Sequence, residues 1–181
     1  VSSEIAPLMQ FLFQQSYNQG CVPEDWNKAI VTAIHKKGPK WDPGNYRPIS
    51  LTCLVCKVME HVVLSHMAKH LAEHNILLDS QHGFREKLST QTQLITSVHD
   101  WATTLNNRGQ CDLVLLDFSK AFDMVPHRRL AVKLDYYGIR GPTLRWIVSF
   151  LSNRQQAVGV NGSLSSWEQV TSGVPQDSVQ G

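Results

Sequence analysis

The sequence contains no long hydrophobic run. No stretch approaches the roughly 18 consecutive apolar residues typical of a transmembrane helix, and the first residues, Val1-Ser2-Ser3-Glu4, have neither the basic start nor the apolar centre of a signal peptide. We therefore expect no membrane contact and an intracellular location, which could include the nucleus. The chain starts without methionine and stops just after a turn-like Gly-Val-Pro-Gln, so we expect it to be part of a longer protein.

Cysteine and net charge are both low. Four cysteines at irregular positions do not form a disulfide framework in a chain of 181 residues, which agrees with a reducing environment. The 17 basic and 15 acidic residues leave a net charge of +2, so only local clusters of charge can indicate a nucleic-acid partner. A hydrophobic content of 42% over 181 residues indicates a globular chain, with either one sizeable core or a domain with a small lobe.

Hydrophobic periodicity predicts a helix-rich α+β protein with small antiparallel sheets. Apolar residues at a spacing near 3.6 predict helices, and short apolar runs bounded by turn residues predict strands. The Asn161-Gly162 pair predicts a hairpin turn. We expect helices at residues 5–20, 54–71, 89–109, 130–137 and 142–151, and strands at 29–34, 49–51, 113–116, 155–160 and 167–171.

Asp117 follows a run of four apolar residues, 113–116, that predicts a central strand buried on both faces. Ligands of open α/β sheets bind beyond the carboxyl ends of the strands, and Mg²⁺ prefers carboxylate oxygen. Asp117 is therefore a candidate metal ligand. Capping of the following turn is the alternative, and taken alone it is the commoner role of aspartate at such a junction. Asp123 would lie on another face of a helix, so the two are not interpreted as a catalytic pair.

A zinc site at Cys53, Cys56, His66 and His70 has suitable residue types but unsuitable spacing. If residues 54–73 form one helix, Cys56 and His66 are about 15 Å apart along its axis. Two ligands of one Zn²⁺ cannot be that far apart, so a solvated stripe of histidines is favoured over a metal site.

Three further segments carry polar side chains suited to nucleotides, although each is also an ordinary turn. Lys36, Lys37, Lys40 and Arg47 surround one end of an expected antiparallel unit and could bind phosphates. The segment 81–85, Gln-His-Gly-Phe-Arg, combines an aromatic ring for base stacking with a cation. The segment 172–176, Ser-Gly-Val-Pro-Gln, presents an amide that both donates and accepts hydrogen bonds.

Four motifs become specific through their combination and order. They are Gly-Asn-Tyr-Arg-Pro-Ile-Ser-Leu at 44–51, Gln-His-Gly-Phe-Arg at 81–85, Leu-Asp-Phe-Ser-Lys-Ala-Phe-Asp-Met-Val-Pro-His at 116–127, and Ser-Gly-Val-Pro-Gln at 172–176. Over essentially all 181 residues the chain resembles the reverse transcriptase of LINE-type, non-LTR retrotransposons. The resemblance implies a right-hand polymerase fold, with fingers at residues 1–109 and a partial palm at 110–181 that ends before the Asp-Asp hairpin.

The resemblance also implies substrates and site residues. The family copies an RNA template onto a DNA primer with dNTPs and Mg²⁺. By motif, Asp117 binds the catalytic Mg²⁺ ions with the main chain of Phe118 beside it, and Phe122 lies under the sugar of the incoming nucleotide. The triphosphate is held by Arg47 together with Lys36 or Lys37. The same comparison assigns Gln176 to the incoming nucleotide, and Gln81 and Arg85 loosely to the template or nucleotide.

The sequence departs from the family pattern in its acidic residues. Two-metal nucleotidyl transfer needs more than one carboxylate, and no Asp-Asp pair occurs anywhere in the chain. Asp177 stands where the family usually has glycine, and Gln180 stands where it has an apolar residue. We therefore expect these 181 residues to be catalytically silent by themselves. The alternative function is that of a non-catalytic retroelement remnant that binds nucleic acid weakly through its exposed cations.

Overall fold

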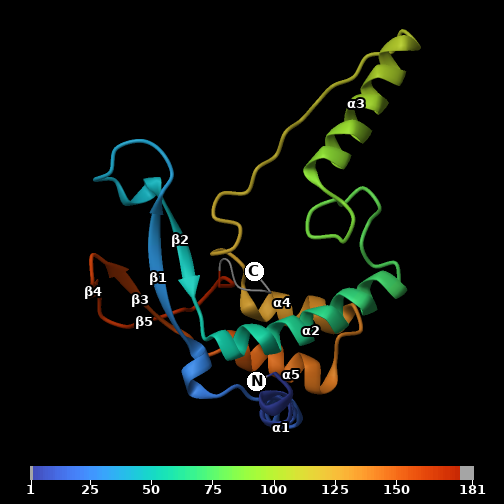
Figure 1. Cartoon of the computed structure of the whole chain (residues 1–181). Coiled ribbons are helices and arrows are strands. Elements are labelled where there is room, and N and C mark those ends of the chain that lie inside the picture. The colour runs from blue at the N-terminus through green and yellow to red at the C-terminus, as the bar shows by residue number, and fades with distance from the viewer. Residues whose placement is uncertain (1, 176–181) are drawn as a thin grey trace. The chain divides into compact units, whose positions relative to one another are not determined.

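The computed structural model describes residues 2–175. Its contacts divide the chain into two compact units, one formed by Val1–Lys69 with Lys120–Gly181 and the other by His70–Ser119. Figure 1 shows the elements of both. Most of the expected elements are present.

The first unit contains a small mixed sheet. Strands β1 (Lys28–His35) and β2 (Tyr46–Leu51) form an antiparallel hairpin, and β3 (Gln155–Val160) lies parallel to β1 on its other edge. Two short strands, β4 (Ser163–Leu164) and β5 (Glu168–Gln169), pair antiparallel with β3. The expectation of small antiparallel sheets is confirmed for β1 with β2 and for β3 with β4 and β5, and was wrong for β1 with β3. Parallel strands need a long crossover connection, and here the whole segment between β1 and β3 provides it.

Helices α1 (Ser2–Gln19) and α5 (Gly141–Leu151) pack on each other in the first unit. The rings of Trp146 and Phe150 stack with centroids 5.6 Å apart, and both side chains are fully buried. The indole nitrogen of Trp146 donates to the Ser16 hydroxyl of α1 over 3.0 Å, which satisfies its only polar atom. Helix α4 (His127–Tyr136) packs on α5. The short helices η1 (Glu24–Asn27) and η2 (Pro43–Asn45) flank β1 and β2.

The long helix α2 (Leu54–Glu73) begins in the first unit and ends in the second. The second unit continues with α3 (Thr90–Asn106), whose start is fixed by a capping box. The Ser89 hydroxyl accepts from the main-chain nitrogen of Thr92 over 3.2 Å, and the Thr92 hydroxyl accepts from that of Ser89 over 2.9 Å. This reciprocal pair satisfies two donors that a helix start leaves open.

The predicted buried strand at residues 113–116 is absent. This segment has no regular secondary structure, and its four apolar side chains are 56–84% exposed. A strand forms when its main-chain donors and acceptors pair with a neighbour, and within residues 2–175 no strand pairs with this segment. An apolar run alone therefore did not determine local structure.

No helix within residues 2–175 combines the length and hydropathy that crossing a bilayer would require.

Candidate functional site

The hairpin of β1 and β2 presents two of the expected phosphate-binding residues on one face of the sheet. Ile34 of β1 faces Arg47 of β2 in the register. The ladder continues one step past the strand, where the main-chain nitrogen of Lys36 donates to the Asn45 carbonyl over 2.8 Å. Side chains alternate between the faces of a strand, so Lys36, two residues after Ile34, falls on the face of Arg47. Lys37 lies in the bend that follows.

The loop that connects these strands is held by its own hydrogen bonds. The Asn45 amide donates to the Pro39 carbonyl over 2.9 Å, and the Tyr46 hydroxyl donates to the Lys40 carbonyl over 2.7 Å. Asp42 accepts from the main-chain nitrogen of Gly44 over 2.9 Å and caps η2. The cations of this loop are thus carried by a defined backbone, and Lys36, Lys37 and Lys40 are all exposed.

The motif around Phe122 lies directly against the Ser-Gly-Val-Pro motif. The main-chain nitrogen of Val174 donates to the Phe122 carbonyl over 2.9 Å, and that of Gly173 donates to the Val125 carbonyl over 2.8 Å. The Ser172 hydroxyl donates to the Asp123 carbonyl over 3.0 Å. Two segments far apart in sequence therefore form one small main-chain junction within the first unit.

Gly173 is required by the geometry of this junction. Its φ is +86°, and a Cβ atom built on it would lie 2.8 Å from the Cα of Asp123 and 2.8 Å from the Phe122 carbonyl oxygen. Both neighbours are main-chain atoms, which cannot move aside as a side chain could. His127 adds a hydrogen bond of 2.6 Å between its Nε2 and the Gly173 carbonyl.

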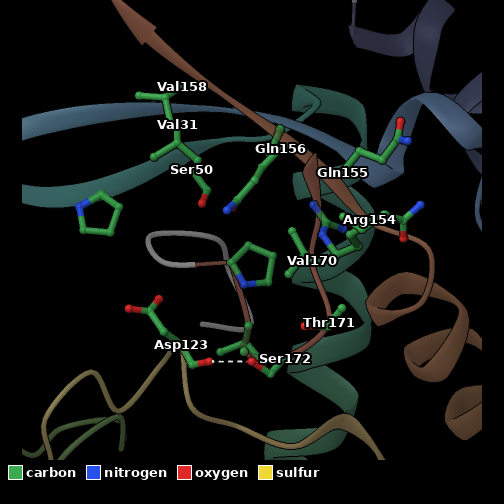
Figure 2. A pocket seen from close by; sticks show the side chains of 16 residues that line it. Val31, Ser50, Asp123, Arg154, Gln155, Gln156, Val158, Val170, Thr171 and Ser172 are labelled. Carbon is green, nitrogen blue, oxygen red and sulfur yellow. Dashed lines mark hydrogen bonds between the residues drawn. The ribbon is translucent and has the colours of Figure 1, made fainter. Parts of the chain in front are cut away.

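A cavity of about 430 Å³ lies between the segment 169–175 and the face of the sheet that does not carry Arg47. Figure 2 shows Ser50 and Gln156 pointing from the sheet toward it, with Asp123 and Ser172 on the far side. Val31 pairs with Ser50 on one side and Val158 on the other, and all three line the cavity. Since Arg47 alternates with Pro48, which also lines it, Arg47 belongs to the other face of the sheet.

A buried polar cluster lies beside this cavity and was not predicted from the sequence. Cys56 and Glu60 of α2 are fully buried, and Arg154, which lines the cavity, is 2% exposed. Arg154 Nη1 donates to the main-chain oxygen of Phe150 over 3.1 Å, and its guanidinium lies 4.6 Å from the Phe150 ring centroid. Burial raises the pKa of Cys56, and the neighbouring charge of Glu60 acts in the same direction. Burial lowers the pKa of Arg154.

The four-residue spacing of Cys56 and Glu60 could have predicted part of this cluster from the sequence. Residues four apart lie on the same face of a helix, so a cysteine and a glutamate at this spacing could have been paired in advance. Arg154 could not have been added, because its contact with α2 depends on how the chain folds back.

The second unit carries the other expected residues. Gln81 donates to the Gly83 carbonyl over 3.4 Å, and Arg85 Nη1 donates to the Leu78 carbonyl over 2.8 Å. These contacts close a compact loop, which holds Phe84 at φ +60° with 92% of its surface exposed. Asp117 and Phe118 are exposed in the irregular segment described above. Gln176, Asp177 and Gln180 lie outside the described residues.

The described residues contain no ready-made cluster of metal-ligating side chains. Within residues 2–175, no three His, Cys, Asp or Glu side chains are grouped closely enough to hold a metal ion. Mg²⁺ takes six oxygen ligands in octahedral geometry, and two ions of a polymerase centre need more than the single carboxylate of Asp117.

Comparison with known proteins identifies the family. The family profile described as reverse transcriptase (RNA-dependent DNA polymerase) matches residues 34–181. The probable RNA-directed DNA polymerase from transposon X-element of Drosophila melanogaster is 33% identical over 160 residues, which cover 88% of this chain and 18% of that protein. The RNA-directed DNA polymerase from mobile element jockey of the same species is 33% identical over 178 residues, which cover 96% of this chain and 19% of that protein.

A more distant relative extends the set beyond Drosophila. The retrovirus-related Pol polyprotein from type-1 retrotransposable element R2 of Popillia japonica is 27% identical over 142 residues. The chain spans about a fifth of the length of the relatives it matches, 18–19% in each. The resemblance seen in the sequence motifs is confirmed, and the chain belongs to the reverse transcriptase (RNA-dependent DNA polymerase) family, with a polymerase fold of helices and a small mixed sheet.

Proposed function

We propose that residues 1–109 form the fingers and residues 110–181 part of the palm of an RNA-directed DNA polymerase, and that this region holds the incoming dNTP on an RNA template and DNA primer. The observation that carries the proposal is the shared sheet face of Lys36 and Arg47. A rigid strand aims a guanidinium and an ammonium in one direction, which suits the several charges of a triphosphate.

Lys36 is the better of the two candidate lysines. The ladder bond from its main-chain nitrogen extends the strand geometry to this residue, so its side chain shares a face with Arg47. Lys37 follows the last main-chain hydrogen bond between the two strands, so strand geometry does not fix the direction of its side chain. We assign Lys36 and Arg47 to the triphosphate and Lys37 to the exposed loop.

The main-chain junction supports a site shared by Phe122 and Gln176, although its neighbours Asp123 and Val174 line the cavity on the sheet face opposite to that of Lys36 and Arg47. Val174, two residues before Gln176 in sequence, is hydrogen-bonded to Phe122. In this proposal Phe122 supports the sugar, Gln176 contacts the nucleotide, and Phe118 contributes main chain beside Asp117. Gln81 and Arg85 contact the template or the nucleotide, a role for which the closed loop at 78–85 offers an exposed aromatic ring.

Mg²⁺ is assigned to Asp117, which would be one of its ligands. When bound, the metal would lower the pKa of the attacking hydroxyl and stabilise the leaving pyrophosphate. Because the chain contains no Asp-Asp pair, we propose no polymerisation by this chain alone.

Binding of a fluorescent dNTP to the full chain tests the assignment of Lys36. A hydrogen bond to a charged group contributes roughly 1.5–3 kcal/mol, so Lys36→Ala and Arg47→Ala should each weaken binding about tenfold or more. Lys37→Ala is the matched control, since it removes an equal charge one residue away, and its affinity should stay within about twofold. Equal losses in the two lysine variants would refute the assignment.

Weak, non-catalytic binding of single-stranded nucleic acid is the second candidate function. It is favoured by the exposure of Lys36, Lys37 and Lys40 on one ordered loop. Phosphate contacts make the logarithm of affinity fall linearly with the logarithm of salt concentration, with a slope of about 0.7 per contact for single strands. A response independent of salt would remove this candidate.

A further inference from the structure

The Cys53-x-x-Cys56 pair occupies the start of α2. The carbonyl of Cys53 accepts from the main-chain nitrogen of Lys57 over 3.1 Å, which is the first hydrogen bond of the helix. Cys53 is therefore the N-cap residue, and Cys56 is the third residue of the helix. The two residues differ in exposure, since Cys53 is partly exposed and Cys56 is fully buried.

The positions of Cys53 and Cys56 at the helix start suit a disulfide between them. Residues three apart in a helix have Cα atoms about 5 Å apart, inside the range of about 4.4–6.8 Å found across disulfides. Both are free thiols in the structure.

The surroundings of Cys56 supply a base and a positive charge. Glu60 lies one turn further along α2, on the same helix face as Cys56, and both side chains are fully buried. Arg154 lies close enough to act electrostatically on Cys56 in the direction that favours the thiolate. Its Nη2 is buried and has no hydrogen-bond partner within residues 2–175, so a donor is available to an anion that forms there.

We propose that Cys53 and Cys56 are a reversible dithiol–disulfide site, with Cys53 as the attacking thiol, Cys56 as the resolving thiol and Glu60 as its base. This site is independent of nucleotide binding and of the polymerase reaction. Its substrate class is a small disulfide that can reach the partly exposed Cys53, such as oxidised glutathione.

The exchange takes two balanced steps. In the first, the Cys53 thiolate attacks one sulfur of the small disulfide, forms a mixed disulfide and releases one thiolate, which takes up a proton from water. In the second, Cys56 transfers its proton to Glu60 and attacks the Cys53 sulfur, which releases the second thiolate, and this takes the proton. Two protein thiols are oxidised and one disulfide is reduced to two thiols.

Mass spectrometry of the full chain in a mixture of reduced and oxidised glutathione tests the proposal. A background of Cys21→Ser with Cys111→Ser removes the two exposed cysteines. In this background, the chain should lose two hydrogen atoms and retain no glutathione, and peptide mapping should place the link between Cys53 and Cys56. A chain that stays reduced, or that accumulates glutathione on both cysteines, would overturn the proposal.

Single variants separate the two roles. Cys56→Ser should trap one glutathione on Cys53, because the resolving thiol is gone. Cys53→Ser should leave Cys56 unmodified, because that thiol is buried. Modification of Cys56 at the rate of Cys53 would contradict the assigned order of attack. Both variants keep Glu60 and Arg154, so the buried charges remain compensated.

The base is tested by Glu60→Gln. The first step should keep its rate, while closure of the mixed disulfide should slow by roughly 100-fold, the lower end of what a positioned base contributes. Circular dichroism of the variant shows whether it is folded. If it is not, a pH series on the background chain replaces it, and closure as slow as that of an unassisted buried thiol would refute the role of Glu60.

Discussion

Gly173→Ala should strongly destabilise the first unit, because it introduces a methyl group where two main-chain segments touch. The added Cβ would lie 2.8 Å from the Phe122 carbonyl oxygen and 2.9 Å from that of Asp123. Contacts this close force one of the segments to move. That movement would stretch the hydrogen bonds of 2.8 and 2.9 Å that join residues 173 and 174 to 125 and 122.

Two terms make up the expected loss. A non-glycine residue at the φ of +86° costs roughly 1–2 kcal/mol, and a methyl group forced into a packed site costs typically about 1–3 kcal/mol more. The free energy of unfolding should therefore fall by roughly 2–5 kcal/mol. A change of that size is a large fraction of the stability of an ordinary domain, about 5–15 kcal/mol.

Urea denaturation followed by tryptophan fluorescence measures this loss, with Gly162→Ala as the matched control. Gly162 has nearly the same φ, +80°, but a Cβ on it would meet no atom within 4 Å. The control should lose only the roughly 1–2 kcal/mol of backbone strain. If both variants lose the same free energy, the close approach at Gly173 contributes nothing to stability.

Three further predictions concern the buried cluster and α3. Arg154→Met should lower the free energy of unfolding by about 3–5 kcal/mol, since it removes a cation buried close to Glu60. The control Arg140→Met, which removes an exposed ion pair with Asp135, should lower it by no more than about 1 kcal/mol. Urea denaturation compares the two variants, and equal losses would contradict the effect of burial. Ser89→Ala should lower the helicity of α3 and cost about 1 kcal/mol, as measured by circular dichroism against Thr90→Ala, and an unchanged signal would show that the cap is not needed. Burial raises the pKa of Cys56 above its ordinary value of 9.0, so above about pH 9 the folded chain keeps a proton on this thiol that the unfolded chain loses. The free energy of unfolding should therefore fall above about pH 9 by up to about 1.4 kcal/mol per pH unit. Cys56→Ala should reduce this slope, and an unchanged slope would rule out Cys56 as its source.

Local patterns predicted most helices and the β1–β2 hairpin. The periodicity of α1, α2 and α5 and the Asn161-Gly162 turn after β3 are short-range signals, and the structure has these elements close to the expected positions. The motif order identified the family, which the comparisons confirmed.

Features that depend on long-range contacts were not predicted. The parallel pairing of β1 with β3 turned an expected antiparallel sheet into a mixed one, and the burial of Arg154 against α2 could not be seen from either segment alone. The prediction of a strand at residues 113–116 was wrong because no neighbouring strand pairs with that segment within residues 2–175. Its composition suits a strand, but strand formation requires a partner, and composition carries no information about one.

The mixed sheet also has a consequence for synthesis on the ribosome. The β1–β2 hairpin can form as soon as it leaves the exit tunnel, because its strands are neighbours in sequence. The free edge of β1, which carries Lys28 to Thr32, must wait until residues 155–159 have been made. Closing so long a loop is slow, and an uncovered edge can pair with other chains in the meantime. Nascent chains stalled before β3 should therefore be the aggregation-prone form of this protein, and those stalled after it should not.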